Sequence, residues 1–179
     1  MKSSLLFLCI IAITIPVYAQ EETLTGDIHK TGSYGGPAVK FASVGGSFGV
    51  FAGGFGGVVY NKKWVVGGGG FGLTNRTEEY GIGYGGGIIE YILNSDKLTH
   101  LSCGFLIGGG GVEKKGPPWT GSQSVFVFEP GINLILNINT GLRMGIGASY
   151  LLLTGSHISG SEFSNPSVNI TFKFGKFSN

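Results

Sequence analysis

A histidine and a serine two positions apart in the C-terminal part of the chain are of the types that catalyse acyl transfer. His157 and Ser159 lie in the segment His-Ile-Ser-Gly-Ser-Glu, which ends at Glu162. A serine becomes a nucleophile when a base lies within hydrogen-bonding reach and a third group orients that base. Serine, glycine and histidine are also ordinary loop residues, and this segment is rich in serine and glycine. We therefore expect two ordinary loop residues, with a hydrolase as the alternative.

A second set of polar residues is placed where period-two alternation would turn the side chains toward an interior. Its members are Glu90, His100, Glu129, Arg143 and Lys173, with Lys40 as an addition. Counting back from the turn at Asn94–Lys97 sets Glu90 almost opposite His100. Charges in a narrow, poorly solvated lumen must pair, because an unpaired one is costly. The favoured interpretation is a polar network that fills a lumen, and the alternative is a proton or ion path along the same groups.

Metal, cofactor and nucleic-acid chemistry find no support in the sequence. The three histidines, His29, His100 and His157, fall in three different segments. The glycine-rich runs 53–57 and 81–85 superficially resemble phosphate-binding loops, but those need a following helix, which we do not expect. The net charge of +2 is too small for a nucleic-acid footprint. We expect no metal, no cofactor and no nucleic-acid partner.

The N-terminus has the pattern of a signal peptide. Lys2 precedes the apolar stretch Leu5–Ile15, and Val17-Tyr18-Ala19 ends in a small residue, which predicts cleavage after Ala19. Export would leave Cys103 as the single cysteine, so an internal disulfide is excluded. Residues 1–19 are the expected signal peptide, 20–34 a flexible N-terminal leader, and 35–177 the folded domain.

Short extended segments separated by turn signals follow from residue 37 onward. We expect eight of them, at 37–44, 48–60, 64–74, 80–93, 98–112, 123–138, 142–153 and 167–177. Glycine supplies 35 of the 179 residues, and each glycine inside a helix costs about 1 kcal/mol. The pattern predicts an all-β fold.

The connections between these segments alternate in length. Three are tight, at Asn61–Lys63, Asn94–Lys97 and Asn139–Gly141, whereas those at 76–79, 113–122 and 154–166 are on average longer and more polar. Short turns on one side and longer loops on the other are typical of outer-membrane barrels. The tight turns would then lie on the periplasmic side.

Alternation along the segments indicates which face meets lipid. Apolar residues share one face of the seventh segment, and glycine, serine and one arginine share the other: Leu142, Met144, Ile146, Ala148, Tyr150 and Leu152 against Arg143, Gly145, Gly147 and Ser149. In the sixth, Leu134 lies on the apolar face and Asn133 on the polar one. The polar residues are too small and sparse for a solvated exterior, so they suit a narrow lumen. A secreted soluble barrel that binds an apolar ligand is the alternative.

Aromatic residues are placed as two interfacial girdles would require. Tyr60, Trp64 and Tyr91 flank tight turns, whereas Tyr80 and Trp119 lie near the opposite loops. Glycine is expected to relieve crowding where strands coil hard to close a small barrel.

The last segment resembles the C-terminal signal of outer-membrane barrel proteins, with Phe172, Phe174 and Phe177 as its aromatic residues. The chain as a whole resembles small eight-stranded barrels of the OmpA/OmpX type and, more closely, the Gly-rich outer-membrane barrels of Bacteroidetes. The likeness is carried by Gly36 to Phe41, Trp64 to Leu73, Glu129-Pro130-Gly131 and Thr171 to Phe177.

This resemblance implies an antiparallel up-and-down transmembrane β-barrel in the outer membrane, with membrane lipid and the barrel insertion machinery as partners. The expected role is non-enzymatic, either structural or through extracellular loops whose partner stays open. Some such barrels remove an acyl chain from lipid A and carry a His-x-Ser pair, which His157 and Ser159 match in type and spacing. A lipid hydrolase is therefore the alternative function.

Overall fold

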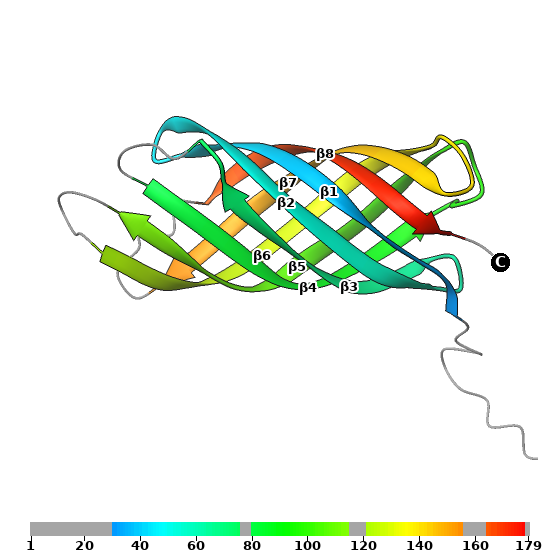
Figure 1. Ribbon diagram of the computed structural model, residues 1–179, viewed down its shortest axis with the longest axis horizontal. Helices are drawn as coiled ribbons and strands as arrows, with labels where there is room; N and C mark the ends of the chain where they lie inside the picture. Colours follow the sequence, from blue (N-terminus) through cyan, green and yellow to red (C-terminus); the bar gives the residue numbers. More distant parts are fainter. Residues whose placement is uncertain (1–29, 76–79, 115–120, 156–163, 178–179) are drawn as a thin grey trace, which may run out of the picture.

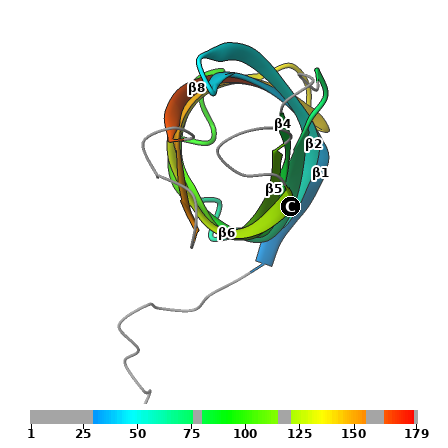
Figure 2. The ribbon, with the colours of Figure 1, turned by 90° about the vertical axis from the view of Figure 1, so that its left-hand side faces the viewer.

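The chain folds into a closed barrel of eight antiparallel β-strands, described by a computed structural model for residues 30–75, 80–114, 121–155 and 164–177 (Figure 1). The strands are β1 (Lys30–Val44), β2 (Ser47–Tyr60), β3 (Trp64–Leu73), β4 (Tyr80–Leu93), β5 (Thr99–Lys114), β6 (Gly121–Asn137), β7 (Leu142–Gly155) and β8 (Asn165–Lys176). Each strand pairs with its neighbour in sequence, and β1 pairs with β8 to close the ring (Figure 2). No helix in the described ranges is long and apolar enough to cross a membrane. The predicted all-β up-and-down architecture is confirmed.

Strand β1 begins earlier than expected, because Lys30–Tyr34 belongs to the barrel and not to the leader. Tyr34 pairs with Gly57 of β2 and with Gly175 of β8, and its side chain is buried inside. Glycine and serine around Tyr34 hide the alternation in the sequence. The expected signal peptide and the rest of the leader, up to residue 29, lie outside the described residues.

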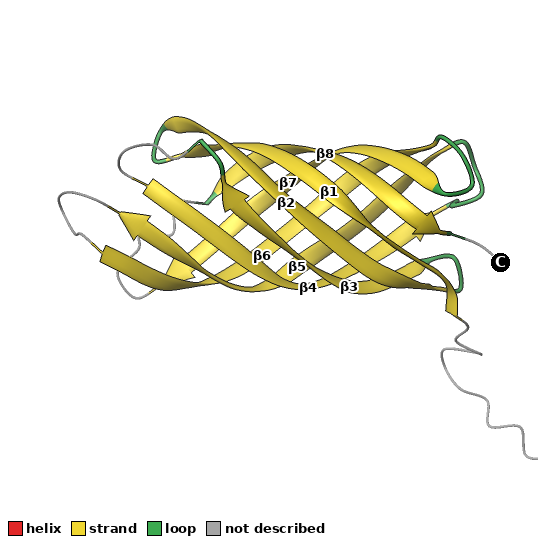
Figure 3. Cartoon of the chain, in the orientation of Figure 1, coloured by secondary structure: helices red, strands yellow, loops and turns green. Residues whose placement is uncertain are grey.

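The two ends of the barrel differ as the connection lengths predicted, with one exception. The start of β1 and the end of β8 lie at the same end as the connections 61–63, 94–98 and 138–141 (Figures 1 and 3). The opposite end carries the connections after β3, β5 and β7, and also the shortest connection of all, Gly45-Gly46. Both glycines have positive φ, 55° and 82°, which suits a two-residue hairpin turn.

Side chains alternate between the inside and the outside of the barrel with the predicted phase. Ile146 and Leu134 point outward and are 53% and 49% exposed, and they pair across β6 and β7. Their inward neighbours Gly145 and Asn133 face the lumen together with Arg143. The predicted outward phase of Leu134 and Ile146 and the predicted inward phase of Asn133, Gly145 and Arg143 are therefore confirmed.

An apolar core packs inside the lumen toward the end that carries the Gly45-Gly46 turn. Its buried members come from all strands but β8 and include Val44, Phe51, Leu73, Tyr80, Ile82, Val112, Val125, Val127, Leu151 and Leu153. Tyr80 was predicted to lie in an outer girdle, and this prediction is wrong. It shares the inward phase of Ile82 and Tyr84 on β4, and its ring lies 5.2 Å from the Lys114 ammonium.

Glycines on the two faces of the wall meet different surroundings. A Cβ on the inward Gly67 would lie 2.0 Å from the carbonyl oxygen of Gly56, and one on Gly108 would lie 2.1 Å from that of Gly85. A Cβ on the outward Gly72 would meet no heavy atom within 4 Å. Inward glycines such as Gly67 and Gly108 thus let neighbouring backbones approach each other. A larger residue would fit at Gly72 without displacing any neighbour.

Two alanine substitutions on β3 test this distinction. Gly67→Ala forces a methyl group into the neighbouring backbone, so we expect a loss of about 1–3 kcal/mol in the free energy of unfolding. Gly72→Ala is the matched control and is expected to be neutral. Urea unfolding of the folded barrel in detergent measures both, and equal stability of the two variants would contradict the assignment.

Candidate functional site

The lumen gathers charged side chains that are almost fully shielded from solvent. Lys40, Glu90, Lys114, Glu129, Arg143 and Lys173 are each at most 9% exposed. They come from β1, β4, β5, β6, β7 and β8, so closure of the barrel brings together residues far apart in sequence. Removing a charge from water is expensive unless a partner of opposite charge and further hydrogen bonds compensate for it. The contacts of these residues therefore decide what the lumen can do.

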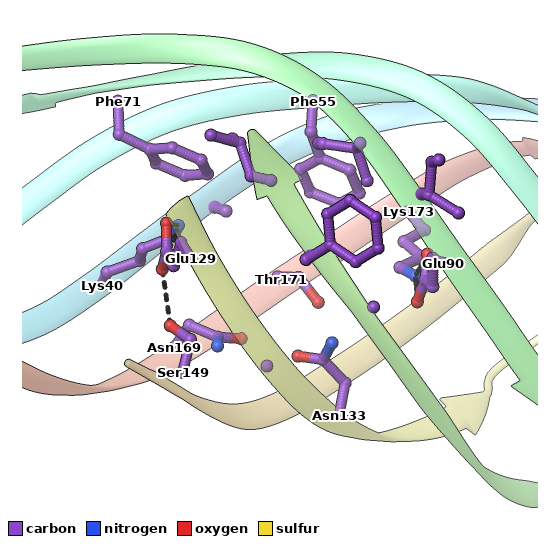
Figure 4. A pocket seen from close by; sticks show the side chains of 17 residues that line it. Lys40, Phe55, Phe71, Glu90, Glu129, Asn133, Ser149, Asn169, Thr171 and Lys173 are labelled. Carbon is purple, nitrogen blue, oxygen red and sulfur yellow. Dashed lines mark hydrogen bonds and ion pairs between the residues drawn. The ribbon is translucent and has the colours of Figure 1, made fainter. Parts of the chain in front are cut away.

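The first ion pair joins β1 to β6 across the lumen. The Nζ atom of Lys40 lies 2.8 and 2.7 Å from the two carboxylate oxygens of Glu129. The Tyr84 hydroxyl donates to Glu129 at 3.0 Å, and the Ser149 hydroxyl donates to it at 2.6 Å (Figure 4). The same ammonium lies 3.5 Å from the ring centroid of Phe71, a cation–π contact. Glu129 thus has three hydrogen-bond donors.

The second ion pair lies nearer to the end of the barrel where β1 begins and β8 ends. Lys173 Nζ lies 2.7 and 3.0 Å from the carboxylate oxygens of Glu90 and donates to the Tyr34 hydroxyl at 3.2 Å. That hydroxyl in turn donates to Glu90. Arg143 of β7 pairs with Lys173 of β8 across the two strands. The guanidinium carbon of Arg143 lies 4.0 Å from the centroid of the Phe177 ring.

These two clusters show what the predicted lumen residues do. Glu129 and Glu90 are each neutralised by a lysine and held by hydroxyl groups, and charge-assisted hydrogen bonds of this kind are the strong ones. Such a carboxylate is a poor general base because its lone pairs are occupied. Within the ranges that the structure describes, no group of three or more His, Cys, Asp and Glu side chains is placed to hold a metal ion.

His100 lies inside the lumen but not opposite Glu90, so this part of the prediction is wrong. The register pairs Glu90 with Gly104, and the first pair beyond the turn is Leu93 with Leu101. The connection is longer than the expected four-residue turn, and this shifts His100 toward the barrel end. Its Nδ1 atom lies 3.4 Å from the carbonyl oxygen of Lys97.

Several lumen residues escaped the sequence-based prediction. Tyr34 was assigned to the leader, and Tyr84 was assigned no role within its glycine-rich segment. Tyr84 lies six residues before Glu90 on β4, and side chains an even number of residues apart on a strand point to the same face. Alternation counted from Glu90 would therefore have placed Tyr84 inside. Ser149 was placed correctly on the face of Arg143, but its bond to Glu129 depends on a pairing between β6 and β7 that no local pattern reveals.

Three of the predicted girdle aromatics lie side by side on the outer surface. Tyr60 pairs with Trp64, and Trp64 pairs with Tyr91. The rings of Trp64 and Tyr91 are 4.8 Å apart between centroids. Trp119 lies outside the described residues.

The three aromatics of the C-terminal segment divide between the faces. Phe172 and Phe174 point outward, whereas Phe177 is buried inside, with its ring centroid 5.5 Å from that of Tyr34. The outward alternation therefore ends at Phe174. His157 and Ser159, the hydrolase candidates, lie outside the described residues.

Comparisons with known proteins identify the architecture. No protein-family model matches the chain, and no curated protein matches it. Among solved structures it is similar to Neisserial surface protein A, with a TM-score of 0.63, 8% identity and coverage of 83% of this chain and 98% of that one. It is also similar to the N-terminal β-barrel domain of Pseudomonas aeruginosa OprF, with a TM-score of 0.62, 7% identity and coverage of 82% and 99%.

A third similar structure is Ail, the attachment invasion locus protein of Yersinia pestis, with a TM-score of 0.52, 12% identity and coverage of 82% and 99%. At these identities the likeness concerns the fold. It agrees with the predicted resemblance to OmpA/OmpX-type barrels in strand number and closure.

Substitutions in the first ion pair test its electrostatic role. Lys40→Met leaves Glu129 uncompensated, so we expect a loss of about 3–5 kcal/mol in the free energy of unfolding. The double variant Lys40→Met/Glu129→Leu removes both charges and should recover most of that loss. Lys62→Met is the control, because the Lys62–Asp96 pair is exposed and 3.8 Å apart, and such pairs contribute about 0–1 kcal/mol. Additive losses in the double variant, measured by urea unfolding, would contradict the pairing.

Proposed function

We propose that the chain is an exported outer-membrane barrel protein with a filled lumen, acting structurally or through surface interactions of its extracellular connections. The observation that carries the proposal is the reversed polarity of the wall. Large apolar side chains such as Ile132 and Phe174 are 61% and 52% exposed, whereas Lys173 and Glu129 are 3% and 4% exposed. A water-soluble protein has the opposite arrangement, and a lipid-embedded barrel has this one.

Strand length supports the same location. The strands contain from 10 to 17 residues, and a tilted strand needs about 9–11 residues to cross a membrane. The aromatic group Tyr60, Trp64 and Tyr91 lies near the short connections, as an interfacial girdle does. The secreted soluble barrel, the alternative considered from the sequence, would need an interior that accepts an apolar ligand, and the lumen holds two ion pairs there.

The lumen supports a role at the surface over a role in transport. The apolar core around Phe51, Tyr80 and Val127 occupies one end of the lumen, and the ion pairs Lys40–Glu129 and Lys173–Glu90 bridge the rest of the interior. A polar path along the charged groups would have to pass this apolar core. We therefore assign the activity of the protein to its connections, the usual carriers of function on a rigid scaffold.

The similar solved structures fit a surface role. One of them is named as a surface protein, Neisserial surface protein A, and another as the attachment invasion locus protein Ail. Ail has also been solved in complex with a heparin analogue, sucrose octasulfate. We carry over the surface role but not the sulfated ligand, because the segments 76–79 and 113–122 of this chain mix acidic and basic residues.

An arginine on the outer surface tests the lipid-facing assignment. Ile146→Arg places a charge near the middle of the proposed lipid band, where it costs about 2–4 kcal/mol. Leu98→Arg is the matched control, since Leu98 is 69% exposed but lies in a connection at the barrel end, where the cost falls to about 0–1 kcal/mol. Unfolding in phospholipid bilayers measures both. A soluble barrel would tolerate Ile146→Arg without loss, and that result would refute the proposal.

A further inference from the structure

The guanidinium of Arg143 lies inside the lumen without a counter-charge from the described residues. Arg143 is the second residue of β7, near the barrel end that carries the connections 61–63, 94–98 and 138–141 (Figure 3), which we call the short-connection end. None of the ion pairs and hydrogen bonds among the described residues includes it. Arg143 is only 9% exposed, and a buried cation is costly unless an anion and hydrogen bonds compensate for it.

The carboxylates around Arg143 already have partners. Glu90 and Asp96 act on its charge through space. Glu90 lies 2.7 Å from the ammonium of Lys173. Asp96, whose side chain is 82% exposed, lies 3.8 Å from the ammonium of Lys62. Inside this end of the lumen, the two cations Lys173 and Arg143 therefore share one carboxylate, and one positive charge is left in excess.

The contact that Arg143 does make leaves its hydrogen-bond donors unused. Its guanidinium carbon lies 4.0 Å from the centroid of the Phe177 ring. Phe177 belongs to a buried apolar cluster, whose other members are Tyr34, Val59, Val65 and Ile92. A ring contact of this kind uses the face of the guanidinium, whereas the five N–H donors lie in its plane. An acceptor must therefore approach the edge of the group.

The guanidinium nitrogens can be reached by a guest. The fully buried polar atoms without a partner in the described residues include the Oδ1 atom of Asn137, which pairs with Arg143 across β6 and β7, but no atom of Arg143. Because the guanidinium nitrogens also have no partner there, they must keep accessible surface. Arg143 does not line the lumen cavity between the two ion pairs (Figure 4), so this surface faces the short-connection end.

The rim of the short-connection end is basic. The charged residues of its described connections and of the last position of β8 are Lys62, Lys63, Asp96, Lys97 and Lys176. Lys63, Lys97 and Lys176 are exposed. Charges of one sign around an opening raise the local concentration of solutes of the opposite sign. The rim therefore attracts anions toward Arg143.

We propose that the short-connection end of the lumen binds a small monocarboxylate through Arg143. The two oxygens of a carboxylate match the planar fork of guanidinium N–H donors, and such bidentate, charge-assisted bonds are strong. One carboxylate also supplies the single negative charge that balances Arg143 and Lys173 against Glu90. An uncharged molecule would leave the guanidinium without a counter-charge. This binding is independent of the role assigned to the connections at the opposite end.

Titration with acetate tests the proposal on the full exported chain, folded in micelles of an uncharged detergent. The sequence contains two arginines, Arg143 and Arg76, so nuclear magnetic resonance can follow the Nε–H signal of each. We expect a saturable shift at Arg143. Arg76 is the internal control, because it follows β3 at the opposite barrel end, and its signal should not respond.

Two further titrations separate a carboxylate site from general effects. Acetamide has nearly the same shape as acetate but no charge, and sodium chloride supplies an anion without a pair of oxygens. Neither should give a saturable shift at Arg143. Equal responses to acetate and to either compound would overturn the proposal. Absence of any response to acetate would also overturn it, since an acidic group of the chain itself would then occupy the guanidinium.

Three substitutions localise the binding of isotope-labelled acetate. Arg143→Met should abolish it, and Arg143→Lys, which keeps the charge but removes the fork, should weaken it on the order of tenfold. Lys176→Met is the matched control at the same end, because Lys176 is exposed, and should leave binding nearly unchanged. Equal binding by Arg143→Met and the unmodified protein would refute the assignment. If Arg143→Met does not fold, the comparison of acetate with acetamide on the unmodified protein decides.

Discussion

The narrow interior of an eight-stranded barrel is the constraint on which the rest of this structure depends. Such an interior is just wide enough for side chains to fill it, so a charge that points inward meets another side chain and not bulk water. The Lys40–Glu129 and Lys173–Glu90 pairs follow from this, as do the hydroxyl groups of Tyr84 and Tyr34 that hold them. The apolar core fills the remaining space at one end.

The same narrowness accounts for the inward glycines. Neighbouring backbones approach so closely at Gly67 and Gly108 that a Cβ would lie about 2 Å from a carbonyl oxygen. Gly147 serves a different purpose, because its missing side chain makes room for the amide of Asn133. Glycine thus lets backbones approach at some positions and accommodates a neighbouring side chain at another.

Much of this arrangement could be predicted from the sequence, since alternation is a local property. It predicted the strands and the outward face of Ile146 and Leu134. The placements of Tyr34 and Tyr80 failed for different reasons. Glycine and serine around Tyr34 hide the alternation, whereas Tyr80 was placed by its nearness to a connection although it shares the inward phase of Glu90 on β4. Partners could not be predicted, since Glu90 meets Lys173 only when β8 closes on β1 and the register of every hairpin is set.

The central claim is that the wall has its apolar face in lipid and its charges inside. Fractionation of cells that express the full chain tests it most directly, with gel mobility compared before and after heating. We expect recovery in the outer membrane and a mobility that changes on heating, because the closed barrel resists unfolding in cold detergent. Recovery as a soluble periplasmic protein whose mobility does not change on heating would contradict it.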